Sequence, residues 1–369
     1  RFVMAQPGVY ISYPFCAQKC SFCNFASGVF PRSLEIEYVA ALHAEIRGFP
    51  WVDRPDTVYL GGGTPSQMDG AALADLLRAI PGTPWLEATM EAAPGTLTAE
   101  NVAAWRSAGI NRVSLGVQSF DTAELSRTGR KHDAAVVAAD CALLRTQGIH
   151  NINLDLIAGM PGQTPRSWNE SLDWIERIAP PHVSVYLFEV DEDSRLGFEI
   201  LQGGGRYGAA AVPSDDTMAE MYGIAVKRLS AMGIERYEIS NFARPGMESH
   251  HNLKYWLLHP YVGFGADAHS FDGMQRVGNV ETAQEYVDCA KAGKPPQSES
   301  TAANLEQERF FVGLRLLQGI EPKSADWLRF AEPIDRFIKD GLLERDGAIL
   351  RLTGPGVLLS NEIFQEFVN

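Results

Sequence analysis

The 369-residue sequence lacks any apolar stretch approaching the roughly 18–20 residues that a membrane-spanning helix needs. It also lacks a basic segment followed by an apolar one at its start, which is the pattern of a secretory signal. We therefore expect a soluble, cytoplasmic protein with no transmembrane segment. Because the first residue is Arg rather than Met, the sequence does not define its natural N-terminus.

Positive charge is also in short supply. The chain has 46 Asp and Glu residues against 32 Lys and Arg, which gives a net charge of −14. A surface that follows nucleic-acid phosphates needs the opposite balance, so no nucleic-acid partner is expected. Hydrophobic residues make up 45% of the chain, and its length suits one large domain plus a small one, because domains usually have about 50–250 residues.

Cysteine is scarce, with five in the chain, but three of the five lie together near the start. Cys16, Cys20 and Cys23 follow the apolar run 8–11 with the spacing CxxxCxxC. Iron–sulfur clusters normally take four thiolates. Three at this spacing can hold three irons of a four-iron (4Fe-4S) cluster and leave the fourth iron open to another ligand. We therefore predict a cluster at these cysteines.

Other cysteine sites need residues that are missing here. A structural zinc site takes four ligands, often from two close pairs, but Cys141 and Cys289 are isolated in the sequence. Covalent heme attachment uses CxxCH, and Cys23 is followed by Asn24. Core thiols would not need a shared loop that contains Lys19. Zinc binding and a purely structural role are the alternatives that fit less well.

Short apolar runs alternate with amphipathic patterns along the first half of the chain. The predicted strands are residues 9–11, 57–60, 86–90, 112–117, 151–157 and 182–187, and the predicted helices are 34–49, 70–80, 99–108, 133–148 and 167–178. Several helical patterns end at Gly, a common C-cap. Six strand–helix units predict an α/β fold with a parallel sheet covered by helices. An open doubly wound sheet and a partial barrel both fit.

The remaining sequence changes character. Glycines at 203–205 precede a predicted helix at 215–232 and a short segment at 234–239, and 291–300 reads as a linker. Beyond it, helices at 305–317, 325–330 and 333–340, a hairpin at 342–352 turning at Asp346-Gly347, and a last helix predict a small helical, winged-helix-like domain. From 302 to 369, eight Lys and Arg stand against eleven Asp and Glu, which argues against DNA binding.

Glycines and polar residues stand where the predicted strands end. Gly61, Gly62 and Gly63, followed by Thr64, let a ligand approach the backbone closely, and they are not a P-loop, because GxxxxGK[ST] is absent. The other polar candidates at strand ends are Glu91, Gln118, Arg130 and Asp155. Burying an unpaired polar group costs about 1–3 kcal/mol. Their convergence predicts a ligand at the strand C-termini, or a polar network that only braces the barrel.

The cysteine run, with the glycine motif one strand later, resembles the radical S-adenosylmethionine (SAM) superfamily. The motifs Gly-Val-Gln-Ser-Phe, Gly-Arg-Lys-His, Leu-Asp-Leu-Ile-Ala-Gly-Met-Pro-Gly and the runs 236–243 and 251–256 narrow the resemblance. Over nearly the whole chain the sequence is similar to the HemW family of heme chaperones, relatives of oxygen-independent coproporphyrinogen III oxidase. This implies a partial (β/α)6 radical SAM barrel at 1–240, an HNxxYW region and linker at 241–300, and a HemN-type C-terminal domain at 301–369.

The resemblance also implies a set of site residues. In the superfamily, SAM completes the cluster, and an electron from the cluster releases a 5′-deoxyadenosyl radical. The implied cluster ligands are Cys16, Cys20 and Cys23, and the implied SAM-binding residues are Tyr10, Phe22, Gly62, Gly63, Thr64, Glu91, Gln118, Arg130 and Asp155. Glu91 and Asp155 would accept hydrogen bonds from ribose hydroxyls, and Arg130 would pair with the SAM carboxylate. Tyr10 and Phe22 would stack near adenine or shield the cluster. No catalytic residue is assigned.

Two features separate the chaperone from the oxidase within this resemblance. The oxidase has a fourth cysteine two residues past the third, where this chain has Phe25, and a longer segment than the nine residues before Tyr10. The HNxxYW motif, which begins at His251, is a proposed heme signature of HemW. His251 is therefore a candidate iron ligand, with Tyr255 and Trp256 against the porphyrin. The alternative is that His251 ties a loop to the barrel and Trp256 fills the core.

The sequence therefore predicts a heme chaperone that binds heme and a SAM-ligated cluster and transfers heme to an acceptor apo-protein. An electron donor for the cluster is a further expected partner. The alternative is a radical SAM enzyme, either an oxygen-independent coproporphyrinogen III oxidase or a HemN-like methyltransferase. Phe25 and the lack of a basic cluster for a tetracarboxylate argue against the oxidase. An oxygen-sensitive cluster also favours the reducing cytoplasm.

Overall fold

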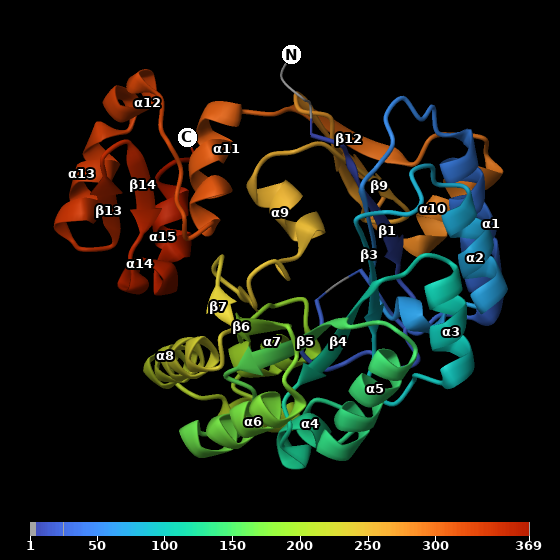
Figure 1. The fold of residues 1–369 in the computed structure, drawn as a ribbon, viewed down its shortest axis with the longest axis horizontal. Coiled ribbons are helices and arrows are strands. Elements are labelled where there is room, and N and C mark those ends of the chain that lie inside the picture. The colour runs from blue at the N-terminus through green and yellow to red at the C-terminus, as the bar shows by residue number, and fades with distance from the viewer. Residues whose placement is uncertain (1–4, 25, 369) are drawn as a thin grey trace.

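The computed structural model describes residues 5–24 and 26–368, and its main body is a curved sheet with helices on the outer face (Figure 1). Six parallel strands pair in chain order: β1 (Gly8–Tyr13), β2 (Thr57–Gly62), β3 (Glu87–Ala92), β4 (Arg112–Gln118), β5 (Asn151–Ala158) and β6 (His182–Leu187). The outer helices are α1 (Arg32–Gly48), α2 (Gly70–Arg78), α3 (Ala99–Ser107), α4 (Thr122–Arg127), α5 (Ala134–Thr146), α6 (Pro165–Ile178) and α8 (Asp215–Ala231), with a 3-10 turn η1 (Pro65–Gln67) after β2. The six predicted strand–helix units are confirmed.

Local chemistry explains why these helices begin where they do. Asp69, Thr98, Asp133 and Thr164 are N-caps whose side chains accept hydrogen bonds from the first-turn amides of α2, α3, α5 and α6. Pro165 follows Thr164 at the first position of α6, where its missing N–H costs nothing. Each helix then buries an apolar face against the sheet. The cap residues fix the position in the chain at which each helix begins.

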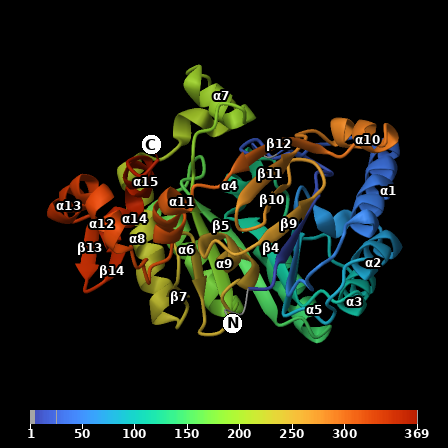
Figure 2. The same ribbon diagram turned by 90° about the horizontal axis from the view of Figure 1, so that it is seen from above.

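Both edges of the sheet carry strands that the sequence does not predict. Next to β1 lie β9 (Tyr261–Phe264), β10 (His269–Phe271), β11 (Gln275–Asn279) and β12 (Gln297–Ala302), and next to β6 lie β8 (Asn241–Ala243) and β7 (Glu235–Arg236). β9 is parallel to β1, and the other added strands pair antiparallel with their neighbours. The segment 291–300, predicted as a linker, is therefore half regular structure. Lys291 is the last residue of helix α10 (Ala283–Lys291), and residues 297–300 belong to strand β12 (Figure 2). The predicted divisions at 240 and 300 stay predictions, and strands from both sides of 240 pair in one sheet.

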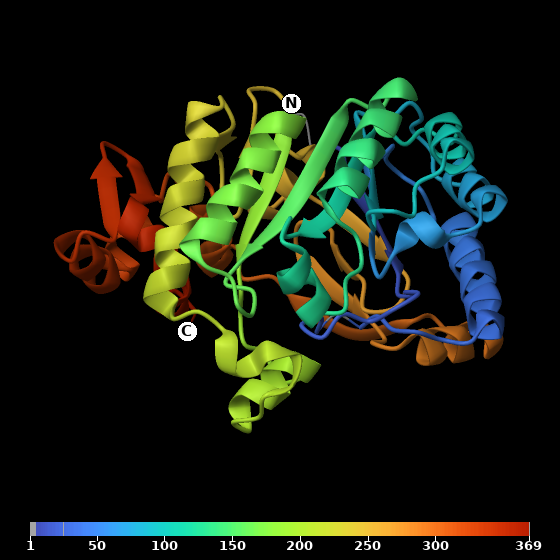
Figure 3. The same ribbon diagram turned by 90° about the horizontal axis from the view of Figure 1, so that it is seen from below.

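An excursion after β6 projects from the body (Figure 3). It contains α7 (Arg195–Leu201) and the 3-10 segment η2 (Arg206–Ala211), on either side of the predicted glycine stretch. Leu196 and Ala209 form a small apolar cluster with Ile157, Met160 and Phe188, separate from the main core. The amide of Leu196 donates to the carbonyl of Ser21 at 2.8 Å. The excursion therefore braces the cysteine loop.

The C-terminal part is a small unit of helices with a hairpin, as predicted. Its elements are α11 (Leu305–Phe311), η3 (Gly313–Arg315), α12 (Ser324–Arg329), α13 (Ala331–Lys339), β13 (Leu343–Asp346), β14 (Ile349–Leu352), α14 (Gly354–Leu358) and α15 (Ser360–Gln365). The hairpin turns at Gly347, and the predicted last helix is two short ones. Phe310 packs with Phe330 and Phe367 in its core, with ring centroids 4.6 Å from Phe310 in both pairs. A backbone bridge between Glu238 and Leu316 joins it to the main body.

Within the described residues 5–24 and 26–368, no helix has both the length and the apolar character needed to cross a membrane.

Candidate functional site

The three clustered cysteines lie on one loop that follows β1. The loop is closed at its base, because the amide of Cys16 donates to the carbonyl of Gly28 at 2.8 Å and the amide of Gly28 donates to that of Pro14 at 2.9 Å. The Thr64 hydroxyl donates to Cys16 Sγ at 3.5 Å. All three thiols are partly exposed, and burial raises the pKa of the Cys16 thiol. The loop therefore presents three soft donors at the carboxyl end of β1.

The donor chemistry fits an iron–sulfur cluster, because three thiols on one loop supply the ligands that iron takes in such clusters. Among the described residues, no three His, Cys, Asp or Glu side chains are gathered closely enough to hold a metal ion. The thiols must therefore turn toward a common centre when a cluster is bound. Phe25, the residue that distinguishes this loop from the oxidase, lies outside the described residues.

The glycine motif joins the end of β2 to the cysteine loop. A Cβ on Gly63 would stand 2.7 Å from the carbonyl oxygen of Phe15 and 2.8 Å from that of Tyr13, and the Gly63 amide donates to the Tyr13 carbonyl at 2.8 Å. Gly62 has φ +104°, which favours glycine. A small cavity here is lined by Tyr10, Ser12, Pro14, Ala26, Ser27, Gly62 and Asp267. The motif thus leaves backbone and open space beside the loop.

Glu91 on β3 lies next to this motif. Its Oε1 accepts a hydrogen bond from the Tyr59 hydroxyl at 2.8 Å, and Oε1 would be 3.1 Å from a Cβ on Gly61. Tyr59 stacks on Tyr10 with ring centroids 6.1 Å apart. Burial raises the pKa of Glu91 to about 7, against the lowering effect of the Tyr59 hydrogen bond. Glu91 is therefore a partly buried carboxyl group that changes its charge near neutral pH.

Asp155 on β5 belongs to a polar network inside the sheet. It accepts hydrogen bonds from the Ser114 hydroxyl at 3.0 Å and the Asn153 amide at 2.8 Å, and burial raises its pKa. The side-chain oxygen of Asn153 also lies 2.6 Å from His182 Nδ1. Asp155 is therefore already partnered, and it has the bracing contacts of the alternative interpretation.

Arg130 and Gln118 lie together at the end of β4. Arg130 Nη1 donates to the Gly116 carbonyl at 2.6 Å, and a Cβ on Gly116 would lie 3.2 Å from Gln118 Nε2 and 3.5 Å from Arg130 Nη1. Gln118 has φ +68°, a strained backbone for a residue with a side chain. The Arg130 guanidinium stands 6.0 Å from the centre of the Phe22 ring. Its Nε is buried without a hydrogen-bond partner among the described residues, so Arg130 has capacity for an anion.

The structure thus brings most of the predicted SAM residues into two groups. Tyr10 and Glu91 both contact Tyr59, and the glycine motif runs from beside Glu91 to Thr64, which contacts Cys16. Arg130 lies next to Gln118 and Phe22. Asp155 is held through Ser114 and Asn153 in the network below. The unpaired Nε of Arg130 fits a ligand that has a carboxylate, and the exposed backbone of the glycine motif fits a ligand that also has a polar face. Tyr59, which joins Tyr10 to Glu91, was missed because it reads as an ordinary strand aromatic.

His251 lies in helix α9 (His250–Trp256) and is buried. Its Nδ1 is 2.9 Å from Thr57 Oγ1, and its Nε2 is 2.9 Å from the Tyr255 hydroxyl. Burial, with Lys254 nearby, lowers the pKa of His251 to about 3, so the ring is neutral. Both ring nitrogens are occupied in this arrangement. It supports the alternative in which His251 ties α9 to the barrel, and the iron-ligand role stays a prediction.

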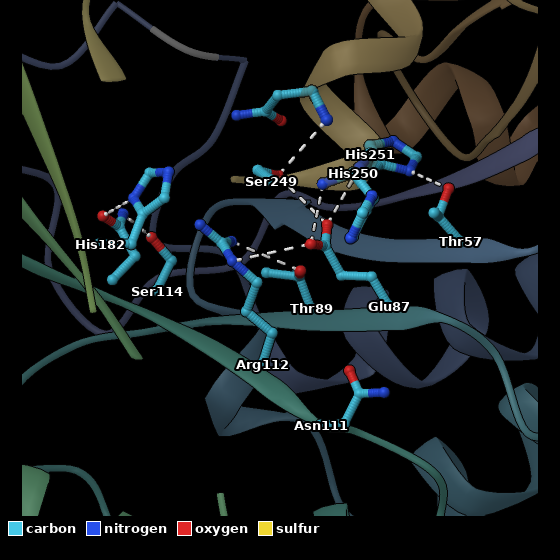
Figure 4. A network of polar contacts seen from close by, with 12 residues as sticks. Thr57, Glu87, Thr89, Asn111, Arg112, Ser114, His182, Ser249, His250 and His251 are labelled. Carbon is cyan, nitrogen blue, oxygen red and sulfur yellow. Dashed lines mark hydrogen bonds and ion pairs between the residues drawn. The ribbon is translucent and has the colours of Figure 1, made fainter. Parts of the chain in front are cut away.

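Sequence reasoning also missed Glu87, the carboxylate that holds the start of α9 (Figure 4). Glu87 accepts hydrogen bonds from the Ser249 hydroxyl at 3.1 Å and from the amides of His250 at 2.9 Å and His251 at 3.0 Å. The Arg112 Nε lies 3.9 Å from Glu87 Oε2, the oxygen that also accepts the His250 amide. The available signal was a charged residue inside the run 86–90, which the sequence predicts to be a strand. Glu87 fixes the HNxxYW helix to β3.

Replacing Glu91 with Gln is expected to raise the free energy of unfolding by about 3 kcal/mol near pH 8. The folded-state pKa lies above the unfolded one, so the protonated carboxyl stabilises the fold below about pH 4.5, and this contribution is lost as the pH rises through about 7. Gln keeps an acceptor for Tyr59 and carries no charge. Urea unfolding at several pH values measures the difference, with exposed Glu100→Gln as control. Equal gains near pH 5 and pH 8 would contradict the assignment.

Comparisons with known proteins agree with this arrangement. Residues 10–175 match the family model of the Radical SAM superfamily, and residues 301–359 match that of the HemN C-terminal domain. The E. coli coproporphyrinogen III oxidase HemN, a radical SAM enzyme, has the same fold, with a TM-score of 0.83 at 21% identity, covering 100% of this chain and 91% of that one.

Three relatives are similar over nearly their whole length. The heme chaperone HemW of Bacillus subtilis is 36% identical, covering 97% of this chain and 98% of the relative. HemW of Lactococcus lactis is 32% identical, covering 97% and 96%, and HemW of Mycobacterium tuberculosis is 35% identical, covering 96% and 93%. The chain therefore belongs to the HemW family, within the radical SAM superfamily.

Proposed function

We propose that this protein is a heme chaperone that binds heme and a SAM-ligated 4Fe-4S cluster and delivers heme to an acceptor apo-protein. The observation that carries the proposal is the similarity over nearly the full length to proteins named as heme chaperones. Phe25 in place of a fourth loop cysteine supports the same choice. An electron donor for the cluster and a cytoplasmic location belong to the proposal.

The proposed cluster ligands are Cys16, Cys20 and Cys23. When bound, a SAM-ligated cluster supplies one-electron reduction of the SAM sulfonium. The Thr64 hydroxyl would stabilise the Cys16 thiolate by a hydrogen bond. The apolar cluster beneath α7, against which Phe22 packs, would keep water from that side of the loop.

Different residues would bind different groups of SAM. Gly62, Gly63 and Thr64 would present backbone to the amino end, and Arg130 would pair with the carboxylate through its unused Nε. Glu91, as the ionised carboxylate, would accept hydrogen bonds from ribose hydroxyls. Further contacts would come from Tyr10, Phe22, Gln118 and Asp155.

The proposed heme site is beside α9, in the HNxxYW region. For His251 to ligate iron, its Nε2 must first lose its hydrogen bond with the Tyr255 hydroxyl. The partly buried Trp256 at the other end of α9 contacts the C-terminal unit through Arg315. Heme binding at the Trp256 end would leave intact the hydrogen bonds between Glu87 and the first turn of α9.

A second candidate is an enzyme, supported by the fold shared with HemN. It would be an oxygen-independent coproporphyrinogen III oxidase or a HemN-like methyltransferase. Phe25 argues against the oxidase, and the methyltransferase has no observation of its own in its favour.

The test uses anaerobically reconstituted protein in two assays. Heme is titrated while the Soret band is recorded, and the protein is separately incubated with coproporphyrinogen III, SAM and a reductant. We expect stoichiometric heme uptake and no vinyl product. Turnover to protoporphyrinogen without heme uptake would replace the chaperone with the oxidase.

A further inference from the structure

Arg315 occupies an unusual position at the junction between the barrel and the C-terminal unit. It is the last residue of η3 and is partly buried. Its guanidinium carbon lies 5.0 Å from the ring centre of Trp256 on α9 and 5.5 Å from that of Phe364 on α15. The cation is thus held between two aromatic rings that come from different parts of the chain.

No ion pair or hydrogen bond from the Arg315 guanidinium to another described residue accompanies these ring contacts. Two other partly buried arginines have carboxylate partners: Arg276 contacts Glu308 at 2.6 Å and Arg309 contacts Asp326 at 2.9 Å. Burial lowers the pKa of Arg315, which means that its lost hydration is not compensated by a close anion.

Two carboxylates act on Arg315 from a greater distance, and neither replaces a direct partner. Glu189 follows β6 and is exposed. Glu238 is buried, and its oxygens already accept hydrogen bonds from the Ser240 amide at 3.1 Å and from the Asn241 side chain. Burial raises the pKa of Glu238, which favours its neutral form. The guanidinium therefore keeps its donors available.

A second unused donor belongs to the ring beneath it. The Trp256 Nε1 is buried and has no hydrogen-bond partner within the described part of the chain. A buried indole N–H normally has an acceptor. An unpaired guanidinium over an unpaired indole therefore indicates a missing acceptor, and an anionic one.

The two donors lie at the junction between the barrel and the C-terminal unit. Glu238 acts electrostatically both on Arg315 and on Tyr186 of β6. Tyr186 is also influenced by Asp155 and Glu91, and 41% of its surface is exposed. Leu316, next to Arg315, forms a backbone bridge with Glu238, so a ligand held at Arg315 would lie where the C-terminal unit meets the barrel.

We propose that Arg315 and the Trp256 indole N–H form a carboxylate-binding site that holds a propionate of the porphyrin. The inference rests on the proposed heme-binding function and assigns the residues that recognise the acidic edge of the ligand. A guanidinium pairs with carboxylates through two parallel hydrogen bonds and stays charged at all physiological pH values.

The test compares heme with heme dimethyl ester, which has the same ring and iron but no carboxylates. Soret titrations give the ratio of the two affinities for wild type, Arg315→Gln, Arg315→Lys and Trp256→Phe. We expect wild type to prefer heme by about tenfold or more, since a hydrogen bond to a charged group contributes about 1.5–3 kcal/mol. Arg315→Gln should abolish most of this preference, and Arg315→Lys and Trp256→Phe should reduce it.

Arg345→Gln is the matched control, because Arg345 also lies over a tryptophan, 4.0 Å from the ring centre of Trp327, but in the hairpin of the C-terminal unit. It should keep the full preference. Heme binding without preference in wild type, or an unchanged preference in Arg315→Gln, would overturn the inference and leave the chaperone proposal standing. Failure of wild type to bind either porphyrin would overturn the chaperone proposal and the inference with it.

Discussion

Replacing Glu87 with Ala is expected to lower the free energy of unfolding by about 3–5 kcal/mol. The carboxylate is almost fully buried and accepts three hydrogen bonds from the first turn of α9. It is also the acidic neighbour of Arg112, whose side chain is 2% exposed. Its removal leaves a buried cation without a counter-charge and strands donors on Ser249, His250 and His251. Urea unfolding by circular dichroism measures the loss.

Two further variants separate the charge from the hydrogen bonds. Glu87→Gln keeps an acceptor but removes the charge, so its loss should lie between zero and that of Glu87→Ala. Adding Arg112→Met to Glu87→Ala should recover part of the stability, because the buried cation is then gone. A loss below about 1 kcal/mol in Glu87→Ala would contradict the network, since an ordinary surface substitution stays within about 0.5 kcal/mol.

The register of the sheet explains why Glu87 and His251 act together. Thr57 on β2 is the register partner of Glu87 on β3. Thr57 contacts the His251 ring while Glu87 receives the His251 amide. The first turn of α9 is therefore fixed to two adjacent strands. At the other end, Trp256 contacts Arg315 through its ring face, and its Nε1 has no hydrogen-bond partner among the described residues. This contrast favours the Trp256 end as the part of HNxxYW that meets a ligand.

The six central strands were predictable because apolar residues recur at every second position in short runs between helical patterns. Residues 112–117 and 151–157 show this alternation, and the capped helices between them set the spacing. The strands β9 to β12 were not predictable. β12 is Gln-Ser-Glu-Ser-Thr-Ala and exposed throughout, and β9 pairs with β1, which lies far from it in the sequence. Local composition contains no information about such a distant partner.

Some residues of the candidate site could likewise be predicted from the sequence, and others could not. Chain topology places the C-termini of the six parallel strands on one edge, so Gly62 and Glu91 could be expected to be neighbours before any contact was known. The contacts of Tyr59, Glu87 and Arg315 depend on side-chain reach between strands or between domains, and no periodicity encodes it. Residues whose role is set by their own backbone position were predicted, and residues whose role is set by a partner were missed.

The second large effect is expected in the cysteine loop. Cys16→Ser, Cys20→Ser and Cys23→Ser should each retain at least about tenfold less iron than wild type after anaerobic reconstitution, since even changes to groups around a metal ligand cost about 10–100-fold in affinity. Serine is a harder and far less acidic ligand than the soft thiolate that iron–sulfur clusters take. Iron content and the visible absorption band of the cluster are the measurements.

Cys289→Ser is the control, because Cys289 lies in α10, away from the loop, and is also partly exposed. It should keep the iron of wild type. Thr64→Val should lie between the two, because it removes the hydroxyl that donates to Cys16 and leaves all three thiols. Equal iron in Cys23→Ser and Cys289→Ser would show that the loop does not bind a cluster through these thiols. A graded series, with the cysteine variants lowest and Thr64→Val intermediate, would identify the loop and the glycine motif as one metal-binding unit.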